Sequence, residues 1–157
     1  MAFVDELVAQ TDDVMAAVRF LAAQPFVDPK RVAVAGCSLG GIESLLAAER
    51  ATGIVAAIDF AGGAMMWAKQ PPLRALMSAA ARAADVPVLF LQAENDFDTS
   101  PSRILSEVRR AAGKPGRARI FTAAGSTAAD GHAFCSGGSD PPWGDEVLAF
   151  LKETASP

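Results

Sequence analysis

A short apolar run that ends in a glycine-rich turn constrains the fold of this chain more than any other feature. The run is Arg31-Val32-Ala33-Val34-Ala35, and the turn is Gly36-Cys37-Ser38-Leu39-Gly40-Gly41. A short, continuous apolar run of this kind is typical of a strand that is buried on both faces. The segment after the turn has a helical pattern up to about Arg50. We therefore expect a strand, a tight turn centred on Ser38 and a helix in direct succession.

Helical and strand patterns alternate along the rest of the chain. We expect strands over 31–35, 54–60, 87–92 and 119–122, and helices over 4–24 (with 11–13 as a candidate break), 39–50, 73–83, 100–112 and 144–153. A polar, glycine-rich loop is expected over 124–142. Such alternation predicts an α/β fold with a mainly parallel sheet of about four strands, flanked by helices in three layers. We expect residues 1–157 to form a single domain, since no linker or repeat interrupts the pattern.

Composition excludes several classes of function. The net charge of −4 provides no basic surface for nucleic acid, and no stretch approaches the roughly 20 apolar residues of a membrane span. The acidic N-terminal segment does not resemble a signal or transit peptide. Two cysteines, Cys37 and Cys135, do not make a disulfide framework or a zinc site. We therefore expect a cytoplasmic, reducing location and no metal.

Ser38 is the first candidate for chemistry, because a Gly-x-Ser-x-Gly turn between strand and helix exposes the serine hydroxyl at the end of a sheet. Small residues at Gly36 and Gly40 are expected to prevent clashes across that turn. The N–H of Leu39, at the start of the helix, could donate to a developing oxyanion. The alternative is a glycine-rich turn without chemistry, such as one that binds phosphate.

A serine nucleophile needs a base, and His132 is the one histidine in the sequence. It lies after the last expected strand, and an imidazole ordinarily exchanges protons near neutral pH. The third member should be a carboxylate that follows an intervening strand. Asp96 is our choice there, ahead of Asp98, which could cap the next helix, and Glu94, which is close to the strand. The alternatives are a surface or structural histidine and a carboxylate that only serves a turn.

The order Ser38, Asp96, His132 and the segment Val27–Gly41 resemble the α/β-hydrolase superfamily, and within it the dienelactone-hydrolase-like branch. Segments Pro87–Asp96 and Gly131–Phe134 are similar to the acid and histidine loops of that branch. Members of the branch are expected to carry cysteine as the nucleophile, whereas here the centre of the turn is Ser38. Cys37 lies one place too early, and we interpret it as a small buried residue.

The resemblance also implies strands before the nucleophile strand, and this chain has only about 30 residues there. The usual second oxyanion donor is therefore absent. Candidates to replace it are Ala2-Phe3, Gly62-Gly63 or a partner chain. The strand at 31–35 should become an exposed edge, which predicts a homo-oligomer, most simply a dimer that covers this edge.

The resemblance implies a serine hydrolase that cleaves short-chain carboxylic esters through an acyl-enzyme intermediate, without a cofactor or metal. Its partner would be a small-molecule ester, with no nucleic acid and no membrane. Trp67, Phe97 and Phe134 are candidates for the substrate pocket, and Met65 and Met66 could line it or belong to the core. Two alternatives stay open. One is a thioesterase, lactonase or peptidase of the same fold, and the other is an inactive, truncated interaction module.

Overall fold

The fold is built on a four-stranded parallel sheet, seen in a computed structural model that describes residues 2–50, 52–136 and 141–154. The strands follow the chain in the order β1-β2-β3-β4 across the sheet. They are β1 (Ala33–Cys37), β2 (Ala56–Phe60), β3 (Val88–Ala93) and β4 (Gly116–Phe121). The helices are α1 (Ala2–Ala22), α2 (Leu39–Arg50), α3 (Pro71–Ala83), α4 (Ser100–Ala111), α5 (Ala128–His132), η1 (Ala133–Ser136) and α6 (Gly144–Thr154).

Strand residues alternate between two apolar cores, as the pleat of a sheet requires. Val34 pairs with Ala57, which pairs with Val88, and all three lie in the larger core together with α1–α4. Ile58 pairs with Leu89, and both belong to the smaller core on the other face of the sheet. Phe134 and Phe150 pack in the same core. The central strands β2 and β3 are therefore buried on both faces.

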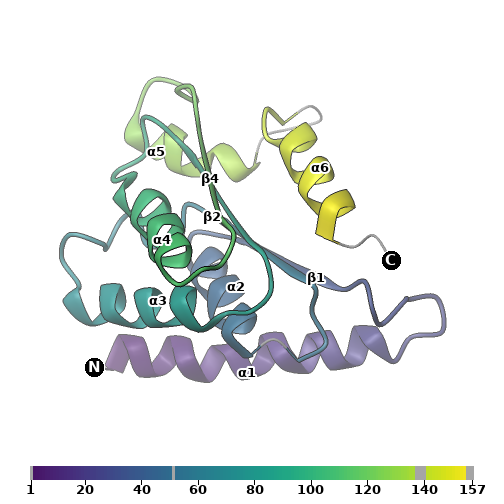
Figure 1. Ribbon diagram of the computed structural model, residues 1–157. Coiled ribbons are helices and arrows are strands. Elements are labelled where there is room, and N and C mark those ends of the chain that lie inside the picture. Colours follow the sequence, from purple (N-terminus) through teal and green to yellow (C-terminus); the bar gives the residue numbers. More distant parts are fainter. Residues whose placement is uncertain (1, 51, 137–140, 155–157) are drawn as a thin grey trace.

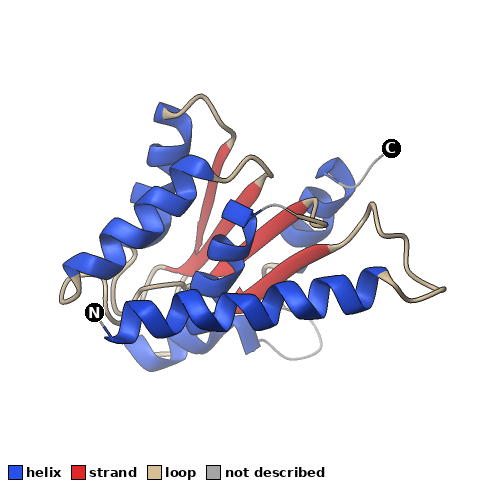
Figure 2. Cartoon of the chain, turned by 90° about the horizontal axis from the view of Figure 1, so that it is seen from below, coloured by secondary structure: helices blue, strands red, loops and turns tan. Residues whose placement is uncertain are grey.

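Helices cover both faces of the sheet and make three layers (Figures 1 and 2). Helix α1 extends along the outside of α2 and α3 on one side, while α6 lies on the other side of the sheet. The expected three-layer α/β fold with about four parallel strands is confirmed. Among the described residues, no helix has both the length and the apolarity needed to cross a membrane.

The local differences from the expected elements have physical causes. Helix α1 continues through residues 11–13, because Thr11 is buried and its hydroxyl donates to the Leu7 carbonyl at 2.8 Å. The expected loop at 124–142 contains α5 and η1, and its residues 137–140 lie outside the described ones. Helix α4 begins at Ser100 without a side-chain cap from Thr99. The Asp98 carboxylate accepts the Ser100 N–H at 2.8 Å there instead.

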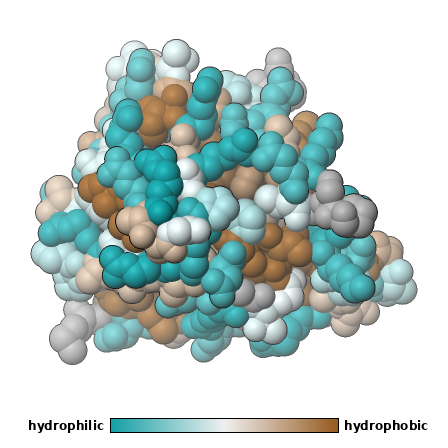
Figure 3. Space-filling model, viewed as in Figure 1, coloured by the Kyte–Doolittle hydropathy of each residue, from teal (hydrophilic) through white to brown (hydrophobic). Residues whose placement is uncertain are grey.

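Among the described residues, strand β1 is an edge of the sheet, as predicted. Two apolar hollows flank this edge. One lies between the 26–31 turn and α6 and includes Phe26 and Leu148, which are 81% and 56% exposed. The other lies between α1 and β1 and includes Leu21 and Ala35. Figure 3 shows hydrophobic atoms at the surface in the region where Figure 1 places β1.

Candidate active site

Ser38 occupies the turn between β1 and α2 in a conformation that L-residues rarely adopt, with φ at +58°. Its N–H donates to the Phe60 carbonyl of β2 at 2.8 Å, which fixes the turn to the neighbouring strand. A Cβ on Gly36 would lie 2.1 Å from the Gly40 carbonyl oxygen, so a glycine is required at position 36. The turn therefore presents the serine hydroxyl beyond the carboxyl end of β1.

Gly40 was also expected to prevent a clash across the turn, and the structure does not show this role. A Cβ at position 40 would meet no atom within 4 Å among the described residues, so a clash at that residue is not the reason for glycine. Only position 36 of this pair requires glycine, because the backbone of Gly40 occupies the space that a Cβ on Gly36 would need. Gly41 is the second crowded position, since a Cβ there would lie 2.3 Å from a carboxylate oxygen of Asp59.

His132 ends the short helix α5, which a capping box starts. The Thr127 hydroxyl accepts the Asp130 N–H at 3.1 Å, and the Asp130 carboxylate accepts the Thr127 N–H at 2.9 Å. Hydrogen bonds to its carboxylate lower the pKa of Asp130, the Thr127 side chain contributing most and the N–H groups of Ser126 and Thr127 next. Asn95 joins this segment to the end of β3, because its amide donates to the carbonyls of Ala124 and Thr127, both at 2.9 Å.

Asp96 lies in the turn after β3, and its buried carboxylate is surrounded by donors. Oδ1 accepts the Phe97 N–H at 2.7 Å, and Oδ2 accepts the Gln92 amide at 2.8 Å. Gln92 is itself fixed, because it also donates to the Asp98 carbonyl and accepts the hydroxyl of Ser102, both at 2.7 Å. The carboxylate therefore has one orientation available to it.

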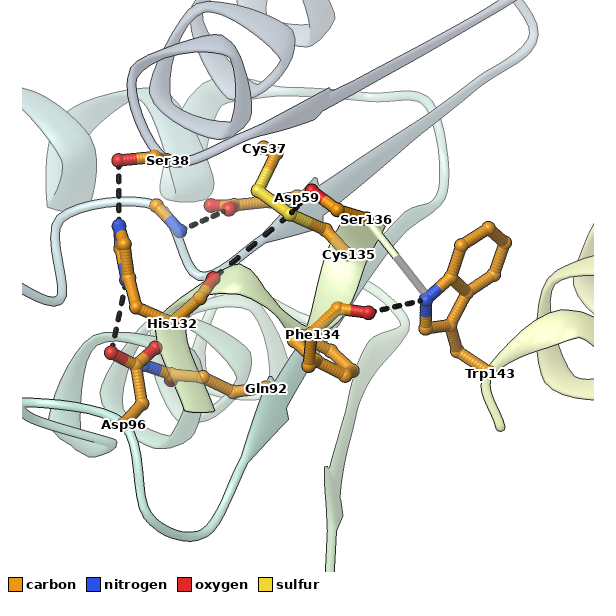
Figure 4. Close-up of a disulfide and its surroundings, with 11 residues drawn as sticks. Cys37, Ser38, Asp59, Gln92, Asp96, His132, Phe134, Cys135, Ser136 and Trp143 are labelled. Carbon is orange, nitrogen blue, oxygen red and sulfur yellow. Dashed lines mark hydrogen bonds and ion pairs between the residues drawn. A yellow bond between two sulfur atoms is a disulfide. The ribbon is translucent and has the colours of Figure 1, made fainter. Parts of the chain in front are cut away.

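The structure brings Ser38, His132 and Asp96 together in a hydrogen-bonded row (Figure 4). The Ser38 Oγ lies 2.8 Å from His132 Nε2, and His132 Nδ1 lies 2.9 Å from Asp96 Oδ1. An ionised carboxylate only accepts, so Nδ1 carries the proton and Nε2 is free to accept from the serine hydroxyl. Asp98 and Glu94 lie elsewhere: Asp98 accepts the N–H at the start of α4, and Glu94 accepts the Ala123 N–H at 3.2 Å.

Comparison with known proteins identifies the fold in which these three residues lie. The prolyl oligopeptidase family model matches residues 7–71, which include Ser38 and leave out Asp96 and His132. Among solved structures, Porphyromonas gingivalis dipeptidyl peptidase 4 is 19% identical with a TM-score of 0.68, over 92% of this chain and 22% of its own. The chain has the α/β-hydrolase fold. No curated protein matches it in sequence.

Two further solved structures show the range of similar proteins. A puromycin-hydrolyzing peptidase of Mycobacterium tuberculosis is 22% identical with a TM-score of 0.69, over 93% of this chain and 26% of its own. An esterase of Pyrococcus furiosus is 16% identical with a TM-score of 0.66, over 92% of this chain and 61% of its own. The chain thus spans about a quarter of the length of the peptidases and less than two thirds of this esterase.

Cys37 and Cys135 form a disulfide, which corrects the interpretation of Cys37 as only a small buried residue. Cys37 and Cys135 are 98 residues apart in sequence, yet their Cα atoms lie 6.2 Å apart. Spacing along the chain contains no information on this proximity. The fold creates it by placing the end of β1 beside the turn that follows His132 (Figure 4).

A pocket of about 460 Å³ opens beside Ser38, and its lining is mostly apolar. Met65 and Met66 line it, together with Phe3 of α1 and Ile42 of α2. Of the three aromatic residues predicted from the sequence, Trp67 packs in the larger core and Phe134 in the smaller one. Phe97 is half exposed and lies edge-on to the His132 ring, with the ring centroids 5.7 Å apart. Trp67 and Phe134 are only 5% and 4% exposed, so their side chains belong to the core of the fold.

The structure distinguishes between the backbone N–H groups that were candidates for oxyanion donors. Leu39 is the first residue of α2, so its N–H has no carbonyl partner within the helix. Gly62 is already engaged, because its N–H donates to Asp59 Oδ1 at 2.7 Å. Phe3 and Gly63 both line the pocket beside Ser38. Phe3 and Gly63 are therefore better placed than Gly62 to provide a second oxyanion donor.

Two buried polar residues near the site were missed by the sequence analysis. Asp59 lies within β2, and burial raises its pKa to about 7, although the Gly62 N–H partly opposes this. Gln92 lies within β3 and positions Asp96. Each interrupts an apolar strand, and a polar residue in such a run needs a buried partner. Among the described residues, no group of three or more His, Cys, Asp or Glu side chains could hold a metal ion.

Proposed function

We propose that this chain is a serine hydrolase in which Ser38 is the nucleophile, His132 the base and Asp96 the residue that orients the base. The observation that carries the proposal is the 2.8 Å contact between Ser38 Oγ and His132 Nε2. A nucleophile, a base within hydrogen-bond reach and a third group that orients the base are what acyl transfer requires. The α/β-hydrolase fold and its peptidase and esterase neighbours support the same class of reaction.

In the proposed reaction, the Ser38 oxygen attacks the substrate carbonyl while His132 Nε2 accepts the hydroxyl proton. Asp96 stabilises the imidazolium that forms, since its Oδ1 already accepts the Nδ1–H at 2.9 Å. The same proton then moves from Nε2 to the leaving group, and an acyl-enzyme remains on Ser38. A water molecule reverses these steps and releases the acid. The Leu39 N–H donates to the oxyanion in both halves.

For the substrate we propose short-chain carboxylic esters that place an apolar acyl group in the pocket beside Ser38. The pocket supports this choice by its size and by the side chains of Ile42, Met65 and Met66. Peptides are a second candidate class. The match of residues 7–71 to the prolyl oligopeptidase family favours them, and so do the peptidases among the similar structures.

The decisive experiment is labelling with a fluorophosphonate probe, followed by hydrolysis assays. We expect the protein to react with the probe and the Ser38→Ala variant not to react. Activity on p-nitrophenyl acetate and its longer homologues is then compared with activity on peptide anilides. Faster ester hydrolysis supports the ester proposal, and preferred cleavage of anilides supports the peptidase. A folded protein that is not labelled would instead indicate an inactive interaction module.

The cytoplasmic location predicted from the sequence stays a prediction, and the disulfide bears on it. Disulfides persist mainly in oxidising compartments and are rare in the cytosol. Cys37 and Cys135 are paired here. The redox state of this pair in the native cell is therefore the measurement that separates a reducing from an oxidising location.

A further inference from the structure

A disulfide joins the two segments that bear Ser38 and His132. Cys37 is the last residue of β1 and directly precedes Ser38. Cys135 lies in η1, three residues after His132, and its sulfur is 3.9 Å from the His132 carbonyl oxygen. Figure 4 shows the bond beside the row of hydrogen bonds from Ser38 to Asp96. The disulfide therefore joins the segment that bears the nucleophile to the segment that bears the base by a covalent bond.

The other anchors of the histidine segment attach it to a different part of the molecule. The side chain of Asn95 binds the backbone at Ala124 and Thr127, and Gly131 packs closely against Asn95. Asn95 is the neighbour of Asp96 in the turn after β3. These contacts therefore position His132 relative to Asp96 and leave its distance to Ser38 to other interactions.

The turn that bears Ser38 belongs to the edge strand β1, which pairs with β2 alone in the part of the chain that the structure describes. A contact between Phe134 and Phe60, with ring centroids 6.0 Å apart, links η1 to β2 rather than to β1. Among the described residues, the direct links between the serine turn and the histidine segment are the disulfide and the bond from Ser38 Oγ to His132 Nε2. Phe60 of β2 links them only indirectly, since it accepts the Ser38 N–H at 2.8 Å and packs against η1. A single partly exposed hydrogen bond contributes little net stability, because water competes for both groups.

We propose that the Cys37–Cys135 disulfide positions His132 on Ser38, so that the hydrolase reaction depends on the oxidised state of this pair. The inference rests on the proposed function. Reduction by a dithiol breaks the S–S bond: two electrons and two protons pass to the cysteines, and the reductant becomes a cyclic disulfide. The histidine segment then keeps its anchors to Asn95 and loses its covalent link to the serine turn.

The first measurement is the rate at which a fluorophosphonate labels Ser38 before and after treatment with dithiothreitol. We expect reduction to lower this rate at least tenfold and reoxidation to restore it. The Cys37→Ala/Cys135→Ala double variant should have the low rate from the start and be insensitive to dithiothreitol. A labelling rate that stays within twofold after reduction would overturn the proposal.

The second measurement is independent of activity. The sequence contains a single histidine, so the proton NMR signal of its hydrogen-bonded Nδ1–H is assigned without ambiguity. In the oxidised protein we expect this signal from the bond to Asp96 to be sharp. In the reduced protein, with an unchanged circular dichroism spectrum, the Asn95 anchors keep the bond to Asp96, and we expect the signal to shift because Nε2 of the same ring has lost the Ser38 hydroxyl. A sharp, unshifted signal in the reduced protein would contradict a positioning role, and so would global unfolding on reduction.

A matched control separates positioning from a general loss of stability. Leu105 is fully buried in α4, in the larger core and away from the histidine segment. The Leu105→Ala variant should be destabilised and still keep the sharp histidine signal and the sensitivity of labelling to dithiothreitol. If this variant loses the histidine signal while its disulfide is intact, the signal reports stability and the positioning inference fails.

The outcomes also distinguish the two proposals from one another. If the oxidised protein and its Ser38→Ala variant are labelled equally, the hydrolase proposal fails and the NMR signal still tests the placement of His132. If labelling of the oxidised protein depends on Ser38 but reduction changes neither the rate nor the signal, only the role of the disulfide fails.

Discussion

Gln92 donates to one carboxylate oxygen of Asp96 at 2.8 Å, while the other oxygen accepts from His132 at 2.9 Å. The Phe97 N–H is a third donor, at 2.7 Å. All three partners of Asp96 therefore donate, and the carboxylate only accepts. This relationship separates Asp96 from the other carboxylates in its loop, because neither Asp98 nor Glu94 lies against the imidazole.

The first prediction concerns the Asp96→Asn variant. An asparagine replaces one acceptor by an N–H2 group, which must face either Gln92 or the donors on Oδ1. The imidazole then favours the tautomer with its proton on Nε2, and this nitrogen cannot accept from Ser38. We expect kcat to fall by roughly 10³–10⁴-fold with little change in KM. An Asp98→Asn variant serves as the control, and equal effects of the two substitutions would contradict the assignment.

The second prediction compares two glycines of the turn. A Cβ on Gly36 would lie 2.1 Å from a backbone carbonyl oxygen, whereas a Cβ on Gly40 would meet no described atom within 4 Å. We expect Gly36→Ala to lower the free energy of unfolding by about 1–3 kcal/mol or more and to disturb Ser38. Gly40→Ala should change it by no more than about 0.5–1 kcal/mol, in the stabilising direction. Urea denaturation measures both, and similar values would refute the geometry of the turn.

The third prediction concerns Asp59 and pH. Burial raises the pKa of this carboxyl to about 7 in the folded chain, so the folded state retains a proton that the unfolded state loses near pH 4. The resulting stabilisation is fully present below about pH 4 and is lost as the pH rises through about 7. Asp59→Asn cannot ionise, so its free energy of unfolding should decline less between pH 5 and 8 than that of the unmodified chain.

Urea denaturation at several pH values in this range tests the effect of Asp59. Asp13→Asn is a suitable control, because Asp13 is exposed on α1. The control should reproduce the pH dependence of the unmodified chain. Parallel stability curves for Asp59→Asn and the unmodified chain would show that Asp59 ionises normally.

The fourth prediction concerns the edge of the sheet. Strand β1 is flanked by apolar hollows, and an unpaired strand edge of this kind recruits a second strand. We predict a homodimer that covers this edge. The Ala35→Lys substitution places a charge on β1 and should give a monomer, while Ala79→Lys, at an exposed position of α3, should not. Light scattering at micromolar concentration distinguishes these cases, and a monomeric unmodified chain would exclude the dimer.

Much of the fold follows from local patterns in the sequence. Short apolar runs and the glycines of the Ser38 turn determine the order of strands and helices, because backbone conformation and burial depend on neighbouring residues. The segment bounds shift by a few residues, as for the strand predicted at 31–35 that lies at 33–37. The position of Ser38 between β1 and α2 belongs to this locally determined part.

The tertiary structure decided what depends on contacts between distant residues. It brings His132 to Ser38 across 94 positions, pairs Cys37 with Cys135 across 98, and surrounds Asp96 with donors that include Gln92. It also buries Trp67 and Phe134, which the sequence had suggested for a pocket, and places Met65 and Met66 beside Ser38. Local patterns specify which residues lie in a strand or a turn, whereas distances between side chains arise only when the sheet and its helices pack.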